Sequence, residues 1–239
     1  MNSGAANRPS WRERRSTINL VWQIVAYLVV IVGAIVLMIP FVWMISSSLK
    51  PLNQIFAQPP VWLPNPPQWR NYTDAWNALP FTQFLLNTLF ITVLGVVGSV
   101  FTSALVGYGF ARYSFFGRDT LFILLLSTMM LPYVVTLIPG FLIWRQFGLI
   151  NTYDPLIMYA LLGGGPFFIF LMRQFMSSIP PELEEAARID GANTMDIFLR
   201  VILPLVRPAL LAVAIFSFQG AWNDFLGPLI YLSDMKTYT

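Results

Sequence analysis

Long apolar runs separated by short polar stretches set the pattern of this chain. Five runs are long enough for a membrane-spanning helix, which needs about 20 mostly apolar residues. The five runs are residues 20–46, 84–111, 119–143, 156–176 and 203–231. Backbone groups in hydrocarbon must be paired within the protein, and these runs are too long for barrel strands. The pattern therefore predicts an all-α, polytopic membrane helical bundle with five spans.

Two of the predicted spans contain residues that interrupt a helix. Pro132 and Pro139-Gly140 lie inside the third run, and Gly163-Gly164-Gly165-Pro166 lies inside the fourth. Breaks of this kind line a cavity in some transporters, or form kinks whose backbone groups are satisfied by neighbouring helices. The sequence leaves both interpretations open.

The basic residues predict the orientation of the spans, because Lys and Arg are enriched in cytoplasmic loops. With the N-terminus inside, ten of the 14 basic residues fall on the cytoplasmic side. These ten are Arg8, Arg12, Arg14, Arg15, Arg112, Arg118, Arg173, Arg188, Arg200 and Arg207. The first apolar run is too long for a signal peptide and is read as a retained span. We therefore expect a basic cytoplasmic N-terminus over residues 1–19, and a transmembrane domain over 20–239 in the cell (inner or plasma) membrane.

Residues 50–80 form the one substantial external segment in this topology. The segment contains seven prolines, which favour extended or turn geometry, and three tryptophans, which prefer the membrane–water boundary. It is either an ordered loop on the outer leaflet or a docking face for an external partner.

Small residues recur every four positions in the second span. They are Gly95, Ser99, Ser103, Gly107 and Ala111. This spacing places them on one helical face and allows close approach of another helix, so the stripe predicts helix packing.

The composition makes several functions improbable. The chain has 56% hydrophobic and only 10% charged residues, with no Cys and no His. We assign no catalytic and no metal-binding residue, and the net charge of +3 follows from topology and does not indicate nucleic-acid binding. A phosphate-binding loop is absent from the sequence, so the chain is not itself an ATPase.

Few polar residues lie inside the spans. Asn87, Gln219 and Asn223 could hydrogen-bond a polar solute, although interhelical hydrogen bonding or capping explains them as well. No convincing ionisable group lies deep in a span, which disfavours a secondary carrier driven by protons or sodium. We therefore expect the energy for any transport to come from another protein.

The most informative segment is a charged island between two apolar runs, residues 182–193. Pro180-Pro181 followed by Glu182, Glu184 and Glu185 is typical of a helix start. Asp190-Gly191 predicts its end, and Asn193 or Thr194 can cap a second helix that runs to Pro204 and leads directly into the last span. A rigid polar helix and turn at this place indicates a surface that another protein binds.

At these residues the chain resembles the inner-membrane permease family of ATP-binding-cassette (ABC) importers. The family hallmark is Glu-Ala-Ala, three residues, Gly, nine residues, Ile, one residue and Leu-Pro. The matching positions here are Glu185, Ala186, Ala187, Gly191, Val201, Leu203 and Pro204, with Val in place of Ile. The motif is long, and it falls on a loop that the topology places in the cytoplasm.

The carbohydrate-importer branch, similar to the second maltose permease subunit, resembles the chain most. The resemblance extends over nearly the whole chain after the basic N-terminus, and includes Asn71-Tyr72, Asn87-Thr88-Leu89, Met130-Leu131-Pro132 and Trp222-Asn223-Asp224-Phe225. It implies a fold like that of type I ABC importer permeases, and a sugar or related polyol as the solute. A permease for a non-sugar solute is the alternative.

The resemblance also implies partners and site residues. Residues 177–203 would form a cytoplasmic coupling loop seated in a separate ATPase, with Glu185, Ala186, Ala187, Asp190, Gly191 and Pro204 as its coupling residues. Two copies of that ATPase would bind ATP and Mg²⁺, leaving this chain without a cofactor. A second, distinct permease subunit would complete a heterodimer in the lipid bilayer, and an extracellular or periplasmic binding protein would deliver the solute. Members of this branch have six spans, so we expect this sequence to be truncated after the fifth.

Overall fold

The computed structural model describes residues 11–239 of the chain, with side chains from Asn19 onward. Over these residues the secondary structure is helical and contains no strand, which confirms the all-α prediction. The first part of the predicted basic N-terminus, residues 1–10, lies outside the described residues. The chain divides into two compact units, Met1–Leu79 and Pro80–Thr239, which are described separately.

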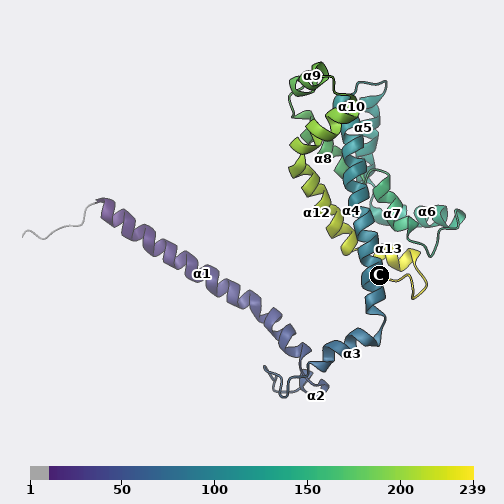
Figure 1. Ribbon diagram of the computed structural model, residues 1–239. Coiled ribbons are helices and arrows are strands. Elements are labelled where there is room, and N and C mark those ends of the chain that lie inside the picture. The colour runs from purple at the N-terminus through teal and green to yellow at the C-terminus, as the bar shows by residue number, and fades with distance from the viewer. Residues whose placement is uncertain (1–10) are drawn as a thin grey trace, which may run out of the picture. The chain divides into compact units, whose positions relative to one another are not determined.

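The first unit consists of one long helix and a loop with two short ones. The helices are α1 (Trp11–Ser48), α2 (Leu52–Ile55) and α3 (Arg70–Ala78) (Figure 1). The apolar side chains of α1 are exposed from Leu20 to Val42. A helix with apolar side chains on all faces suits a lipid environment, so the first predicted span is confirmed over Asn19–Ser48.

The predicted external segment folds back on the end of α1. Trp62 packs edge-to-face on Trp43 with ring centroids 5.1 Å apart, and the hydroxyl of Ser46 donates to the carbonyl of Trp62. Lys50 is buried, with its Nζ 3.7 Å from the centroid of the Trp43 ring. These contacts describe an ordered loop, and its role as an external docking face stays a prediction.

The second unit contains the remaining helices, most of them in one bundle (Figure 1). They are α4 (Phe81–Arg112), α5 (Arg118–Ser127), η1 (Thr128–Met130), α6 (Tyr133–Gln146), α7 (Asp154–Leu161), α8 (Pro166–Ser177), α9 (Glu182–Ile189), α10 (Thr194–Asp196), η2 (Ile197–Ile202), α11 (Leu203–Leu205), α12 (Arg207–Trp222) and α13 (Leu226–Tyr231). The central helix is α4, which packs against α7, α8 and α12.

Among the described residues, three helices are long and apolar enough to cross a membrane, or five segments if two bent helix pairs each count as one span. The three are Asn19–Ser48, Phe81–Arg112 and Asp154–Ser177. The third predicted span is one of the bent pairs: Arg118–Met130 and Tyr133–Gln146 meet at 104°. The bend lies at Pro132, whereas α6 continues through Pro139 and Gly140, so the expected break at Pro139 is wrong.

The fourth predicted span is interrupted where the sequence indicated, between Leu161 and Pro166. Several backbone groups of the break are paired: the amides of Leu162 and Gly164 donate to the carbonyls of Met158 and Tyr159, and the carbonyl of Gly165 accepts from the amide of Ile169. The two halves still qualify together as one span. This arrangement favours a satisfied kink over a break that exposes backbone groups to a cavity.

We expected the second helix of the charged island to lead directly into the last span, but the structure shows a bend between them. Thr194–Leu205 meets Arg207–Trp222 at 79°. Ile197, Phe198 and Ile202, which the sequence placed in a loop outside the membrane, are at most 2% exposed. The segment bends because its apolar side chains are buried against the bundle, and the span proper begins only at α12.

The small-residue stripe of α4 packs against neighbouring helices. Ser99, Ser103 and Gly107 are buried, and a Cβ atom on Gly107 would lie only 2.6 Å from the Cβ of Met172 in α8. Because carbon atoms need about 3.5–4.0 Å, only glycine permits this approach of α4 to α8. The packing role predicted for the stripe is confirmed.

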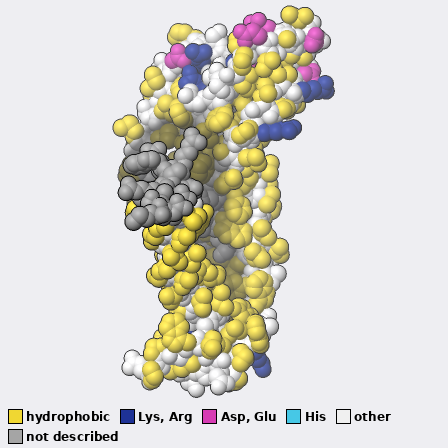
Figure 2. All heavy atoms as spheres, turned by 90° about the vertical axis from the view of Figure 1, so that its left-hand side faces the viewer, with side chains coloured by type: hydrophobic (Ala, Val, Ile, Leu, Met, Phe, Trp, Pro, Cys, Tyr) yellow, Lys and Arg dark blue, Asp and Glu magenta, His cyan; other side chains and the backbone are white. Residues whose placement is uncertain are grey.

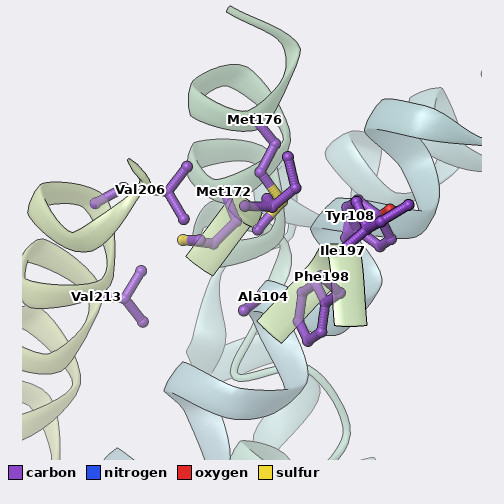
Figure 3. Packing of buried hydrophobic residues seen from close by; sticks show 10 residues of the cluster. Ala104, Tyr108, Met172, Met176, Ile197, Phe198, Val206 and Val213 are labelled. Atoms are coloured by element: carbon purple, nitrogen blue, oxygen red, sulfur yellow. The ribbon is translucent and has the colours of Figure 1, made fainter. Parts of the chain in front are cut away.

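A cluster of buried apolar side chains lies beside the charged island. It is formed by residues of α4, α8, η2 and α12 and by Val206 between α11 and α12: Ala104, Tyr108, Met172, Met176, Ile197, Phe198, Ile202, Val206, Ala209 and Val213 (Figure 3). Figure 2 shows charged side chains gathered at the end of the second unit where α9 lies. The polar end and the core of the second unit are therefore adjacent.

Candidate functional site

The charged island forms a helix–turn–helix on the surface of the second unit. Its first helix, α9, begins after Pro181 and carries Glu182, Glu184 and Glu185 in the first turn. Acidic residues stabilise this end of a helix because they oppose the partial positive charge of its unpaired N–H groups. The helix start predicted from the sequence is therefore confirmed.

Gly191 forms the turn that ends α9. Its φ of +85° lies in the left-handed region, which glycine adopts without steric cost. The amide of Gly191 donates to the carbonyl of Arg188 at 3.0 Å, and the amide of Ala192 donates to that of Ala187 at 2.9 Å. This pair of bonds is the Schellman motif. It satisfies the last carbonyls of α9 and fixes the direction in which the chain leaves it.

Asn193 caps the next helix. Its side-chain Oδ1 accepts a hydrogen bond from the amide of Asp196 at 2.9 Å. The chain then enters the buried segment η2, where the ring of Phe198 lies 5.0 Å from the ring of Tyr108 in α4. Figure 3 shows Phe198 and Ile197 beside Tyr108, with Met172 and Met176 on the neighbouring helix. One arm of the turn is thus anchored in the apolar core.

Some of the site residues expected from the motif are exposed, and the others are half-buried. Glu185, Ala186, Asp190 and Gly191 are exposed, together with the apolar side chain of Ile189, which is 87% exposed. Ala187 is half-buried and packs on the core cluster. Pro204 is half-buried in α11, two residues before the bend at Val206. The exposed set therefore combines polar side chains with one large apolar side chain.

Glu184 is the exception among the acidic residues of α9, because it points inward. Its Oε1 lies 2.6 Å from Nε of Arg112, the last residue of α4, with side chains only 8% and 12% exposed. The two atoms form an ion pair without an aligned hydrogen bond. Arg112 also donates from its guanidinium to the carbonyl of Ile179 at 2.8 Å, and the hydroxyl of Tyr108 lies 3.4 Å from Glu184 Oε2. We call Glu184, Arg112 and Tyr108 the Glu184 cluster.

The sequence did not single out the Glu184 cluster. Glu184 stands next to Glu185, and nothing in their residue types separates a buried carboxylate from an exposed one. Arg112 entered only as one of many basic residues that indicate topology. The available signal was the helical spacing of Glu184 and Ala187, which lie three residues apart and therefore on one face of α9.

The polar residues considered for a solute pathway lie near the opposite end of α4. Asn87 is buried and donates from Nδ2 to the carbonyls of Lys236 and Tyr238 at 2.9 and 2.7 Å, while its Oδ1 accepts from Gln83. Gln219 and Asn223 are exposed, and Asn223 donates to the carbonyl of Gln219 at 2.8 Å.

A hollow of about 470 Å³ opens in this region. Its lining includes Thr88, Trp222, Asn223, Asp224 and Tyr238. The structure therefore brings Asn223 to a cavity, whereas Asn87 holds the C-terminal segment and Gln219 is not among the lining residues. Within the described residues, no group of three or more acidic side chains is arranged to hold a metal ion.

Comparison with known proteins gives a family match over more than half of the chain. The family described as "Binding-protein-dependent transport system inner membrane component" matches residues 100–238, which include the whole helix–turn–helix. A solved structure of "a bacterial ABC transporter involved in the import of the acidic polysaccharide alginate" is similar with a TM-score of 0.79 and 26% sequence identity, and the match covers 97% of this chain and 79% of that one.

Curated relatives match at similar identity. The diacetylchitobiose uptake system permease proteins NgcG and DasC of Streptomyces coelicolor are 32% and 33% identical, over 90% and 95% of this chain and 70% and 81% of their own lengths. The sn-glycerol-3-phosphate transport system permease protein UgpE of Yersinia pestis is 32% identical over 91% of this chain and 79% of its own length.

Proposed function

The chain belongs to the family of inner-membrane components of binding-protein-dependent transport systems, and on this premise we propose that α9 and its turn are the surface through which a separate cytoplasmic ATPase drives transport. The supporting observation is the construction of the helix–turn–helix. Its outer face is exposed, while Gly191, Asn193 and the core-packed Phe198 fix its geometry. A surface held in this way can transmit a displacement with little loss to local bending.

The proposed ATPase contact consists of the exposed residues Glu185, Ala186, Asp190 and Gly191, and the half-buried Ala187 and Pro204 complete the proposed coupling residues. The end that carries α9 faces the cytoplasm, and the N-terminus lies on the same side of the membrane. The positions of four basic residues support this orientation. Arg112 and Arg118 flank the loop between α4 and α5, Arg188 lies in α9, and Arg200 lies in η2.

The complete importer, in this proposal, contains two copies of the ATPase, a second permease subunit that differs from this one, and a solute-binding protein on the outer side. ATP and Mg²⁺ bind to the ATPase. This chain supplies half of the translocation pathway, and movement of α9 changes the side to which that pathway opens.

The proposed solute is a sugar or a related polyol. The support is the chemistry named for the similar proteins, which are transporters of diacetylchitobiose, sn-glycerol-3-phosphate and alginate. The hollow near Trp222 and Asn223 offers an aromatic face with an amide and a carboxylate beside it, groups that suit a polyhydroxylated solute. A non-sugar solute is the alternative.

The proposal is tested in the complete transporter with two substitutions on the turn. Gly191→Val forces a β-branched residue into the left-handed region, and Glu185→Lys reverses an exposed charge on the contact surface. We expect the permease to insert in the membrane at the normal level, and either ATPase co-purification or solute uptake to fall. Asp119→Asn is the matched control, because Asp119 is an exposed acid outside the turn that pairs with Arg118. Wild-type ATPase retention together with wild-type uptake in both variants would refute the proposal.

A further inference from the structure

The Glu184 cluster joins α9 to the cytoplasmic end of α4 by charge. Arg112 occupies the last turn of α4 and Glu184 the first turn of α9. A cation at a helix C-terminus and an anion at a helix N-terminus are each favoured by the helix dipole. The ion pair therefore connects the two helix ends in the arrangement that both dipoles favour.

A buried ion pair contributes little net free energy to the contact between two helices. Removing both charges from water costs much of what their attraction returns, and apolar side chains of similar volume often stabilise a fold as well or better. An ion pair does supply a defined geometry, because its attraction depends on where the two charged groups lie. Position, more than stability, is what the Glu184–Arg112 pair contributes.

The helix α9 depends on such a connection because it is short. It has eight residues, and isolated helices shorter than about 12–15 residues are marginal in water. Its inward apolar contacts come from small side chains, with Ala187 before the turn and Ala192 after it packed on the core cluster. The larger inward contact of α9 itself is the one that Glu184 makes with Arg112.

Both arms of the turn meet the same part of α4. Before the turn, Glu184 contacts Arg112 and faces the hydroxyl of Tyr108; after the turn, Phe198 packs on the ring of Tyr108. The guanidinium of Arg112 also holds the carbonyl of Ile179, in the segment that enters α9. A displacement of the turn therefore acts on the end of α4 through four contacts.

We propose that Glu184 and Arg112 are positioning residues that pass the displacement of α9 to α4. The helix α4 has 32 residues, or about 48 Å at 1.5 Å per residue, and it packs along α7, α8 and α12. Movement of its Arg112 end accordingly reaches the end where Asn87 and the hollow lie. This inference rests on the proposed function, since it assumes that an ATPase moves α9.

The experiment measures solute uptake per ATP hydrolysed in the complete reconstituted transporter. Glu184→Gln and Arg112→Gln each remove one charge, Tyr108→Phe removes only the hydroxyl, and Glu184→Arg combined with Arg112→Glu restores an ion pair in reverse. We expect both glutamine variants to retain the ATPase while uptake per ATP falls at least about fivefold, the lower end of typical coupling effects. The reversed pair should recover part of that loss, because it restores the attraction but neither the hydrogen bond to the carbonyl of Ile179 nor the favourable dipole arrangement. Tyr108→Phe should lower the ratio less than either glutamine variant.

Asp119→Asn serves as the matched control, because it breaks an ion pair at an exposed site near the same end of α4. It should leave uptake per ATP unchanged. Glutamine variants that lower only the amount or thermal stability of the transporter, with a wild-type ratio per assembled complex, would overturn the inference. Loss of the ATPase from the glutamine variants would also overturn it, by making Glu184 a docking residue. If Glu185→Lys and Gly191→Val change neither ATPase retention nor uptake, the proposed function fails instead.

Discussion

The two ends of α4 are built differently. At the Arg112 end, large apolar side chains such as Phe198 and Met172 are fully buried, and an ion pair ties α9 to the bundle. At the opposite end, Trp222 and Phe225 are exposed beside a hollow of about 470 Å³, and the C-terminal segment is held mainly by asparagine side chains.

Under the proposed function, the packed end suits transmission of movement and the open end suits binding of a solute. Close-packed interiors have low compressibility and transmit strain, which suits the end that an ATPase would move. Pockets with few polar groups on an apolar lining suit binding of a small molecule. In this comparison, truncation of a large apolar side chain should cost stability at the first end and little at the second.

Phe198 and Phe225 give the sharpest test of the comparison. Phe198→Ala should lower the free energy of unfolding by about 3–5 kcal/mol, because it leaves a cavity in the core. Phe225→Ala should change it by less than about 0.5 kcal/mol, since the Phe225 side chain is 70% exposed. Thermal or denaturant unfolding of the chain in detergent measures both. Equal losses at the two positions would remove the proposed difference between the ends.

Gly107 and Gly109 extend the test to the backbone packing of α4. A Cβ on Gly107 would lie 2.6 Å from Met172 Cβ and 3.1 Å from the amide nitrogen of Arg173, whereas a Cβ on Gly109 would meet nothing within 4 Å. Gly107→Ala should therefore destabilise the chain by about 1–3 kcal/mol through overpacking. Gly109→Ala should stabilise it by up to about 1 kcal/mol, because alanine favours helix. A stable Gly107→Ala variant would show that α4 and α8 can separate without cost.

Much of this architecture was predictable because it depends on local patterns. Apolar runs indicated the spans, four-residue spacing indicated the packing face of α4, and Pro181 with Gly191 indicated the bounds of α9. Each of these features follows from the chemistry of neighbouring residues. The break at Pro132 and the one before Pro166 were visible for the same reason.

The remainder depended on tertiary contacts that no local pattern encodes. Phe198 falls within the predicted cytoplasmic loop of residues 177–203, yet the bundle buries it and the chain bends by 79° before α12. Pro139 was expected to break a helix, but α6 accommodates it. The direction of Glu184 was equally hidden, because its burial depends on Arg112, 72 positions earlier in the chain (184 minus 112).

Asn87 and Asn151 test how the open end is held together. Asn87 acts as a donor to the carbonyls of Lys236 and Tyr238, whereas Asn151 Oδ1 acts as an acceptor from the amides of Ser233 and Asp234. Asn87→Asp should cost about 1–3 kcal/mol locally, because a carboxylate cannot donate and leaves two carbonyls unpaired. Asn151→Asp keeps its acceptor and should cost little. Hydrogen exchange of residues 233–238 measures both, and equal protection in the two variants would contradict these assignments.

Asn193 and Asn223 give the smallest expected effects and the most direct contrast in role. Asn193→Ala removes the cap of the helix after the turn and should cost about 1 kcal/mol. Asn223→Ala removes a bond from an exposed side chain to the carbonyl of Gln219 and should change stability by less than about 0.5 kcal/mol. Because Asn223 lines the hollow and Asn193 does not, only Asn223→Ala should raise the solute concentration for half-maximal uptake in the complete transporter. If Asn193→Ala raises that concentration as well, the proposed separation is wrong, in which the Arg112 end of α4 transmits movement and the opposite end binds the solute.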